Sequence, residues 1–131
     1  MSELVPRIFA ITLFVDDPER SKRFYQKAFD LPASGGDEAS AYFKFGDTIV
    51  NLVAVPAAQE VIRPAQVGGK QAGVRSLLTI EVDDTDSVCG ELARRGVSLL
   101  NGPIDRPWGL RTASFSDPDG HIWEVAQELP E

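Results

Sequence analysis

The chain is poor in cysteine and contains no long apolar run. Its single cysteine, Cys89, excludes an intrachain disulfide, which suits a reducing cytoplasm. Because Cys89 lies in a segment of helical spacing, we expect it to be buried rather than nucleophilic. No apolar stretch approaches the length that spans a bilayer. The sequence therefore predicts a cytoplasmic protein without a membrane partner.

Basic residues are also few relative to acidic ones. Lys and Arg number 13 against 20 Asp and Glu, for a formal net charge of −7 at pH 7. This balance argues against nucleic acid and anionic membranes as partners. It is compatible with a cationic ligand, and it is also common in cytoplasmic proteins for solubility alone. With 43% hydrophobic and 25% charged residues, the composition is that of one ordinary globular domain.

The chain does contain an internal repeat. Residues 11–17 read Ile-Thr-Leu-Phe-Val-Asp-Asp, residues 78–84 read Leu-Thr-Ile-Glu-Val-Asp-Asp, and a segment of helical spacing follows each. Two copies of one unit are therefore predicted. Because a two-fold repeat places equivalent side chains around a shared cleft, candidate site residues can be read off pairs of positions.

The first module is predicted to span about residues 7–55. Asp17 can cap a helix with Pro18 at its first position, and the helix runs to about Phe29. The predicted strands cover residues 8–15, 41–45 and 48–54, the last two around a Gly46-Asp47 turn, with a further short strand near Leu31. These elements follow a β-α-β-β order.

The second module is predicted over about residues 75–129, after a Pro- and Gly-rich connector at about 56–74. Its helix covers residues 85–95 and stops at Gly96, with Val88, Leu92 and Ala93 facing inward. The predicted strands are residues 77–82, a short strand at Leu99, residues 110–116 and residues 122–128.

Strand alternation separates the two faces of each sheet. The apolar sets expected beneath the helices are Phe9, Ile11, Leu13 and Val15 in one module and Leu78, Ile80 and Val82 in the other. The opposite faces, which we expect to line the cleft, carry Thr12, Phe14, Ile49, Asn51 and Val53, and Leu77, Thr79, Glu81, Ile122, Glu124 and Ala126.

Residues 115–124 complete a recognisable pattern. They read Phe-Ser-Asp-Pro-Asp-Gly-His-Ile-Trp-Glu, a turn followed by a strand with Glu at its third position. With the repeated strand-Asp-Asp-helix openings, almost the whole chain resembles the glyoxalase, bleomycin-resistance and extradiol-dioxygenase group, the vicinal oxygen chelate superfamily. The resemblance implies an α+β fold of two tandem βαβββ modules whose sheets form an incomplete barrel around a small-molecule site.

The resemblance also implies where a metal would bind. In metal-dependent members, the ligands lie on the first and last strands of each module, and these positions fall on Ala10, Asn51, Leu77 and Glu124. Two of these are hydrocarbon and one is a neutral amide, so only Glu124 is a strong ligand. We therefore expect no divalent metal and no other cofactor.

Glu124 is the main candidate for chemistry. A carboxylate among apolar neighbours is desolvated, which favours its protonated form and suits a general base or acid. Alternatively, Glu124 anchors a ligand cation or forms a hydrogen bond to Thr12, Thr79 or Asn51. We favour these binding roles, because no second acid-base group or nucleophile is evident beside it.

Other polar and aromatic residues have two interpretations each. Trp108 precedes a strand and either stacks on a planar or cationic ligand or packs in the core. Arg106 and Arg111 either bind an anionic group or form exposed salt bridges. His121 follows the turn glycine and is expected at the surface or in the turn, and Trp123 is expected beneath a helix.

The sequence as a whole favours a homodimer that binds a small organic molecule without a metal, as in the bleomycin-resistance branch. Its mechanism would be sequestration of a cationic or aromatic compound, and open sheet edges favour self-association. The alternative is a lyase, isomerase or dioxygenase-like enzyme with Glu124 as base or metal ligand. A regulatory domain that acts through protein contacts is a third possibility.

Overall fold

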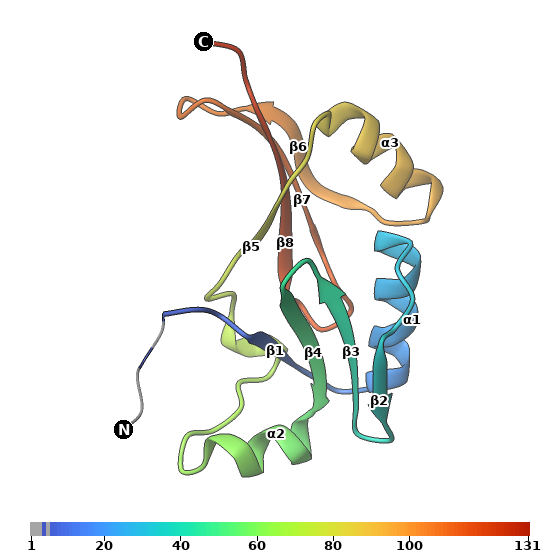
Figure 1. Ribbon diagram of the computed structural model, residues 1–131, viewed down its shortest axis with the longest axis vertical. Coiled ribbons are helices and arrows are strands. Elements are labelled where there is room, and N and C mark those ends of the chain that lie inside the picture. The colour runs from blue at the N-terminus through green and yellow to red at the C-terminus, as the bar shows by residue number, and fades with distance from the viewer. Residues whose placement is uncertain (1–3, 5) are drawn as a thin grey trace. The chain divides into compact units, whose positions relative to one another are not determined.

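The computed structural model describes residues 4 and 6–131 and has an α+β fold with two four-stranded sheets, shown in Figure 1. The chain divides into two compact units, Met1–Gln26 with Leu31–Val67 and Lys27–Asp30 with Gly68–Glu131. Each sheet is built in βαβββ order and remains open, as predicted. Within the described part of the chain, no helix is both long and apolar enough to cross a membrane.

The first sheet has the strand order β1-β4-β3-β2. Its elements are β1 (Ala10–Val15), α1 (Pro18–Phe29), β2 (Gly35–Asp37), β3 (Ser40–Phe45) and β4 (Thr48–Ala54). β1 pairs with β4 in parallel, and the other pairs are antiparallel. Helix α1 begins as predicted, because Oδ1 of Asp17 accepts hydrogen bonds from the backbone N–H groups of Glu19 at 3.1 Å and Arg20 at 3.3 Å.

One face of this sheet is buried, as alternation predicts. The buried side chains are Leu13, Val15, Ala41, Phe43, Val50 and Leu52. Tyr25 of α1 packs on Phe43 with the ring centroids 6.0 Å apart. The inward set does not extend back to Phe9, however, because the strand begins at Ala10 and the Phe9 side chain is 74% exposed.

The second sheet repeats this topology with the order β5-β8-β7-β6. Its elements are β5 (Leu78–Glu81), α3 (Thr85–Arg94), β6 (Leu99–Asp105), β7 (Leu110–Ser116) and β8 (Ile122–Glu128). Helix α3 packs on β6, β7 and β8 (Figure 1). In the same unit, Phe29 at the end of α1 contacts the buried Trp123 with ring centroids 5.1 Å apart, so Trp123 lies against a helix as predicted.

Several local predictions were wrong. The segment expected to be a plain connector contains helix α2 (Val55–Ile62), whose Ala58 is buried, and the 3-10 turn η1 (Lys70–Ala72). The short strand lies at β2 rather than near Leu31. Ala93 is exposed, because the inward side of α3 runs through Cys89 and Leu92.

Two glycines at equivalent places show how closely the modules correspond. Gly36 has φ +143° and Gly102 has φ +91°. A Cβ atom would lie 2.7 Å from the Ala41 Cα at position 36 and 2.6 Å from the Ala113 Cα at position 102. Each glycine therefore lets an edge strand run close to its neighbour: Gly36 lets β2 approach β3, and Gly102 lets β6 approach β7. In the second module this contact extends β6 over seven residues, well beyond the short strand expected at Leu99.

Candidate functional site

Glu124 and Thr79 form a polar pair on one face of the second sheet. They are register partners on the parallel strands β8 and β5, and the Thr79 hydroxyl donates a 2.9 Å hydrogen bond to Oε1 of Glu124. Of the three hydrogen-bond partners considered for Glu124, the structure shows Thr79, and its roles as base or cation anchor stay predictions. Leu77 lies two residues before Thr79 and is 50% exposed. Among the described residues, no cation pairs with Glu124.

The first sheet carries the equivalent positions without a charge. Thr12 on β1 is the register partner of Asn51 on β4, and Phe14 is the partner of Val53. Because strand side chains alternate, Ala10, Thr12 and Phe14 share the face opposite the buried Leu13. The sequence-predicted site residues of this module thus lie together on one face of their own sheet.

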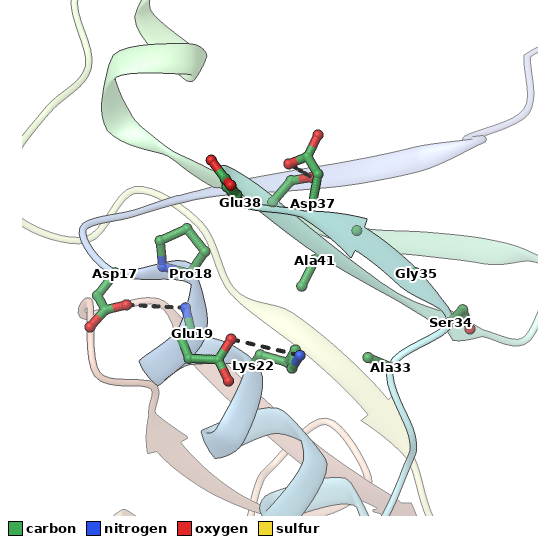
Figure 2. Close-up of a pocket in the computed structure, with 12 residues that line it drawn as sticks. Asp17, Pro18, Glu19, Lys22, Ala33, Ser34, Gly35, Asp37, Glu38 and Ala41 are labelled. Carbon is green, nitrogen blue, oxygen red and sulfur yellow. Dashed lines mark hydrogen bonds and ion pairs between the residues drawn. The ribbon is translucent and has the colours of Figure 1, made fainter.

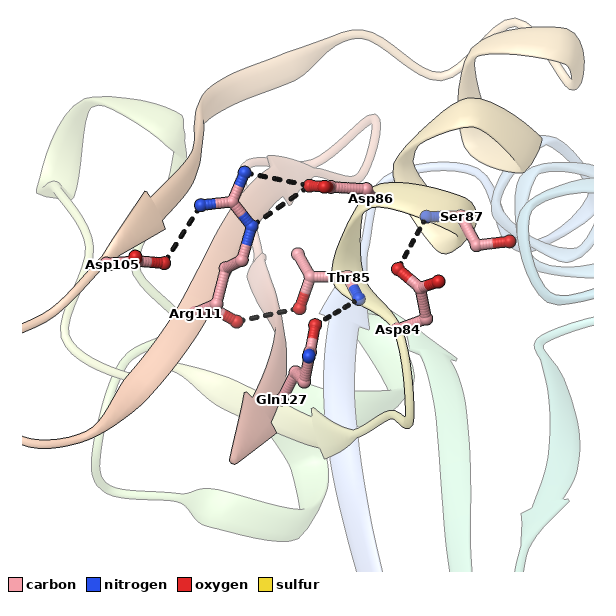
Figure 3. Close-up of polar contacts among 7 residues, drawn as sticks. All are labelled: Asp84, Thr85, Asp86, Ser87, Asp105, Arg111 and Gln127. Atoms are coloured by element: carbon pink, nitrogen blue, oxygen red, sulfur yellow. Dashed lines mark hydrogen bonds and ion pairs between the residues drawn. The ribbon is translucent and has the colours of Figure 1, made fainter. Parts of the chain in front are cut away.

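Arg111 does not lie on the face of Glu124. Ser114 is the β7 partner of Glu124, so Arg111, three residues away, points to the opposite face, on which α3 packs. Figure 3 shows its guanidinium between two acids, with Nη2 2.9 Å from Oδ1 of Asp86 and Nη1 2.9 Å from Oδ1 of Asp105. These hydrogen bonds, with Asp105 first, raise the Arg111 pKa.

The surroundings of Arg111 hold α3 to the sheet. The Thr85 hydroxyl donates to the Arg111 carbonyl at 2.7 Å, and the Thr85 backbone N–H donates to Oε1 of Gln127 at 2.9 Å (Figure 3). Thr85 is fully buried. Of the two interpretations of Arg111, the salt bridges are confirmed and help to anchor α3, and ligand binding by Arg111 stays an untested prediction.

Trp108 and Arg106 form a second polar and aromatic group in the same unit. The Trp108 side chain is 66% exposed, so the core-packing alternative is wrong. The Arg106 guanidinium carbon lies 5.9 Å from the Trp108 ring centroid. Nε of Arg106 also donates to Oγ1 of the buried Thr112 at 3.0 Å. Sequence reasoning did not identify Thr112, although its even spacing from Ser114 places it on the face of Glu124.

His121 and Cys89 lie where the sequence predicted. The His121 backbone N–H donates to Oδ1 of Asp117 at 2.9 Å, within the turn before β8. Cys89 is 7% exposed on α3. Burial, and then the charge of Asp86, raise the pKa of the Cys89 thiol, which disfavours the nucleophilic thiolate.

Each unit also contains a cavity on the helix-covered side of its sheet. In the first unit, a cavity of about 420 Å³ lies between the start of α1 and the β2–β3 hairpin (Figure 2). Three of the four acids that line it have local partners: Asp17 caps α1, Glu19 pairs with Lys22 at 3.7 Å, and Asp37 accepts from the Ala39 N–H. In the second unit, an apolar cavity of about 240 Å³ lies beneath α3.

The family of the chain follows from its similarity to known proteins. Residues 7–125 match the sequence profile of the Glyoxalase/Bleomycin resistance protein/Dioxygenase superfamily. The chain belongs to this superfamily. A virulence protein of Salmonella typhimurium is 24% identical over 127 residues, which cover 95% of this chain and 85% of the relative.

Solved structures share the fold of this superfamily member. A glyoxalase/bleomycin resistance protein/dioxygenase from Nocardioides matches with a TM-score of 0.85 and 24% identity, over 98% of this chain and 87% of its own. A lactoylglutathione lyase from Agrobacterium tumefaciens matches with a TM-score of 0.76 and 18% identity, over 95% and 96% of the two chains. At these identities the likeness establishes the fold alone.

The metal site of the superfamily's metal-dependent members does not fit the residues present. Of the four corresponding positions, Ala10 and Leu77 offer no donor atom and Asn51 offers a neutral amide. Glu124, the remaining donor, already accepts a hydrogen bond from Thr79 on Oε1. Within residues 4 and 6–131, no group of three or more His, Cys, Asp or Glu side chains is arranged to hold a metal ion.

Proposed function

We propose that this superfamily member is a metal-independent small-molecule-binding protein that holds a cationic, aromatic compound through Glu124. The observation that carries the proposal is the Glu124 carboxylate, which Thr79 orients and no described cation neutralises. A carboxylate held in this way gains a charge-assisted hydrogen bond when an ammonium group approaches. The net charge of −7 supports the same choice, because it raises the local concentration of cations.

Sequestration without turnover is the proposed mechanism, in a cytoplasmic homodimer. Within its own sheet, the side chains beside Glu124 are the hydroxyls of Thr79 and Ser114. Thr and Ser hydroxyls are too weakly acidic to ionise near neutral pH, so neither is a ready partner to Glu124 for paired acid-base catalysis. The exposed Trp108 offers a ring for stacking on the aromatic part of the compound.

The alternative is a lyase, isomerase or dioxygenase that uses Glu124 as base or metal ligand. The hydrogen bond from Thr79 to Glu124 favours this enzyme as well, because a catalytic base must be held in a fixed orientation. In this alternative, Glu124→Gln abolishes turnover of a substrate such as lactoylglutathione. In the binding proposal, the wild-type protein leaves that compound unchanged.

Calorimetry with two matched probes tests the proposal. We expect 4-methylbenzylamine to bind the wild-type protein and 4-methylbenzyl alcohol, its neutral analogue, to bind more weakly. Glu124→Gln should weaken the amine by about tenfold or more and leave the alcohol unchanged. Glu128→Gln is the matched control, because it removes the same charge from the exposed end of the same strand.

Metal dependence is tested on protein purified without affinity-tag metals. Elemental analysis should find less than stoichiometric divalent metal, and titration with divalent ions should leave the thermal midpoint unchanged. Near-stoichiometric metal, or a large ion-dependent stabilisation, would overturn the metal-independent part of the proposal.

In the calorimetry experiment, equal affinity of 4-methylbenzylamine for the wild-type and Glu124→Gln proteins would overturn the role of Glu124.

A further inference from the structure

Arg106 lies on the same face of the second sheet as Glu124. Thr112 and Ser114 are two residues apart on β7, so their side chains point to one face, and Ser114 is the register partner of Glu124. The bond from Nε of Arg106 to Oγ1 of Thr112 places the guanidinium over this face. A carboxylate and a guanidinium therefore stand on one surface of one unit.

The register also places Thr112, which holds Arg106, near Glu124. Thr112 is the diagonal neighbour of Glu124 across the antiparallel β7–β8 pair. Diagonal neighbours on one face lie about 7–8 Å apart. The Glu124 carboxylate is bonded to Thr79 on β5, whereas Arg106 is bonded to Thr112 on β7, and no ion pair joins Arg106 and Glu124 in the described chain. Neither charge is neutralised by the other, so both are available to one small molecule.

Arg106 differs from most other arginines in its partners. Among the described residues, the arginines seen to pair with carboxylates include Arg23, Arg63, Arg94, Arg95 and Arg111. Arg106 instead donates to neutral oxygens, Oγ1 of Thr112 at 3.0 Å and Oδ1 of Asn101 at 3.5 Å, and faces the Trp108 ring. Among the described residues, no carboxylate neutralises its charge.

These contacts hold the guanidinium in place without satisfying its charge. Thr112 is 1% exposed, so its hydroxyl is a fixed acceptor, and Trp108 covers the guanidinium from one side. A guanidinium that is already ordered loses little side-chain entropy when a carboxylate binds, and its planar fork suits that group. In a protein with a net charge of −7, an unpaired arginine on a candidate ligand face is a preformed anion-binding group.

We infer that the ligand is zwitterionic, with a cationic group bound by Glu124 and a carboxylate-like anionic group bound by Arg106. Trp108 packs against the part of the ligand that joins the two groups. The cationic half of this inference rests on the proposed function, whereas the anionic half rests on Arg106 alone. The inference narrows the ligand class from aromatic cations to aromatic compounds that carry both charges.

Three compounds of one shape separate the two halves. They are 4-(aminomethyl)benzoate, which carries both charges, 4-methylbenzylamine, which carries the cation, and 4-methylbenzoate, which carries the anion. Calorimetry should show that the wild-type protein binds the first about tenfold more tightly than either of the others. Higher salt should weaken the first compound most, because both of its contacts are ionic.

Variants then assign each charge to its residue. Arg106→Gln should reduce the affinity for 4-(aminomethyl)benzoate to that for 4-methylbenzylamine, without weakening 4-methylbenzylamine. Glu124→Gln should reduce the affinity for 4-(aminomethyl)benzoate to the affinity for 4-methylbenzoate. The matched control is Arg94→Gln on α3, which removes an exposed guanidinium that pairs with Glu91 and should leave all three affinities unchanged.

The outcomes distinguish the inference from the proposed function. If 4-methylbenzylamine binds in a Glu124-dependent way but the added carboxylate gives no gain, the inference is wrong and the proposed function stands. An Arg106→Gln protein that keeps the full preference for 4-(aminomethyl)benzoate also overturns the inference. If no compound binds at millimolar concentration while circular dichroism shows a folded protein, both are wrong.

Discussion

The Thr79 hydroxyl and the Glu124 carboxylate join the first and last strands of the second module through a 2.9 Å hydrogen bond. The same register in the first module pairs Thr12 with Asn51. The repeat thus keeps the threonine and exchanges the carboxylate for an amide. A charged group at this position exists in one module only, which makes the two halves of the fold chemically unequal.

Thr79→Val tests whether this bond prepares Glu124 for a cation. Loss of the hydroxyl frees the carboxylate to rotate and removes a hydrogen bond of about 0.5–1.5 kcal/mol. We expect affinity for 4-methylbenzylamine to fall about three- to tenfold, as measured by calorimetry. Thr12→Val is the matched control and should leave it unchanged. Equal effects of the two substitutions would show that Thr79 has no special relation to Glu124.

Arg111→Gln tests the structural role assigned to this residue. Its guanidinium pairs with Asp86 and Asp105 and its strand is bonded to Thr85, so the substitution should lower the thermal unfolding midpoint. Affinity for 4-(aminomethyl)benzoate should match wild type, because Arg111 points away from the face of Glu124. A selective loss of binding with an unchanged midpoint would restore Arg111 to the ligand site.

Gly102→Ala tests the close contact between β6 and β7. Gly102 and Gly109 both have φ +91°. A Cβ atom at position 102 would clash with Thr112 and Ala113, whereas a Cβ atom at position 109 would have no neighbouring atom within 4 Å. The free energy of unfolding should fall by about 1–3 kcal/mol more for Gly102→Ala than for Gly109→Ala in urea titrations. Equal losses would mean that φ alone accounts for the glycine at position 102.

Glu91 makes part of the stability of α3 dependent on pH. A hydrogen bond from Arg94 holds the Glu91 pKa below its ordinary value of 4.5, with a smaller contribution from Arg95. A lowered pKa means that this stabilisation is complete above about pH 4.5 and is lost as the pH falls through the lower folded-state value. The difference in thermal midpoint between wild type and Glu91→Gln should therefore be largest near neutral pH and shrink below pH 4.5. A difference that stays constant from neutral to acidic pH would contradict this role.

Local sequence signals determined most of the elements. Asp17 and Pro18 started α1, and the Gly46-Asp47 turn set the β3–β4 hairpin, because capping and turn formation depend on residues within a few positions of one another. The repeat and the pattern around residues 115–124 predicted the superfamily to which the chain belongs. Helix α2 was not predicted, because the proline near its start, Pro56, is equally typical of a helix start and of a loop.

The tertiary structure decided which side chains act together. Arg106 and Arg111 are five residues apart and looked alike in sequence, yet one donates to Thr112 on the face of Glu124 and the other pairs with Asp86 beneath α3. That difference depends on the register of β7 against β8 and on the path of β6 past Gly102. Register joins residues far apart in the chain, such as Thr79 and Glu124, through contacts that no local pattern encodes. The sequence by itself therefore determined the fold and the candidate carboxylate, and packing determined its partners.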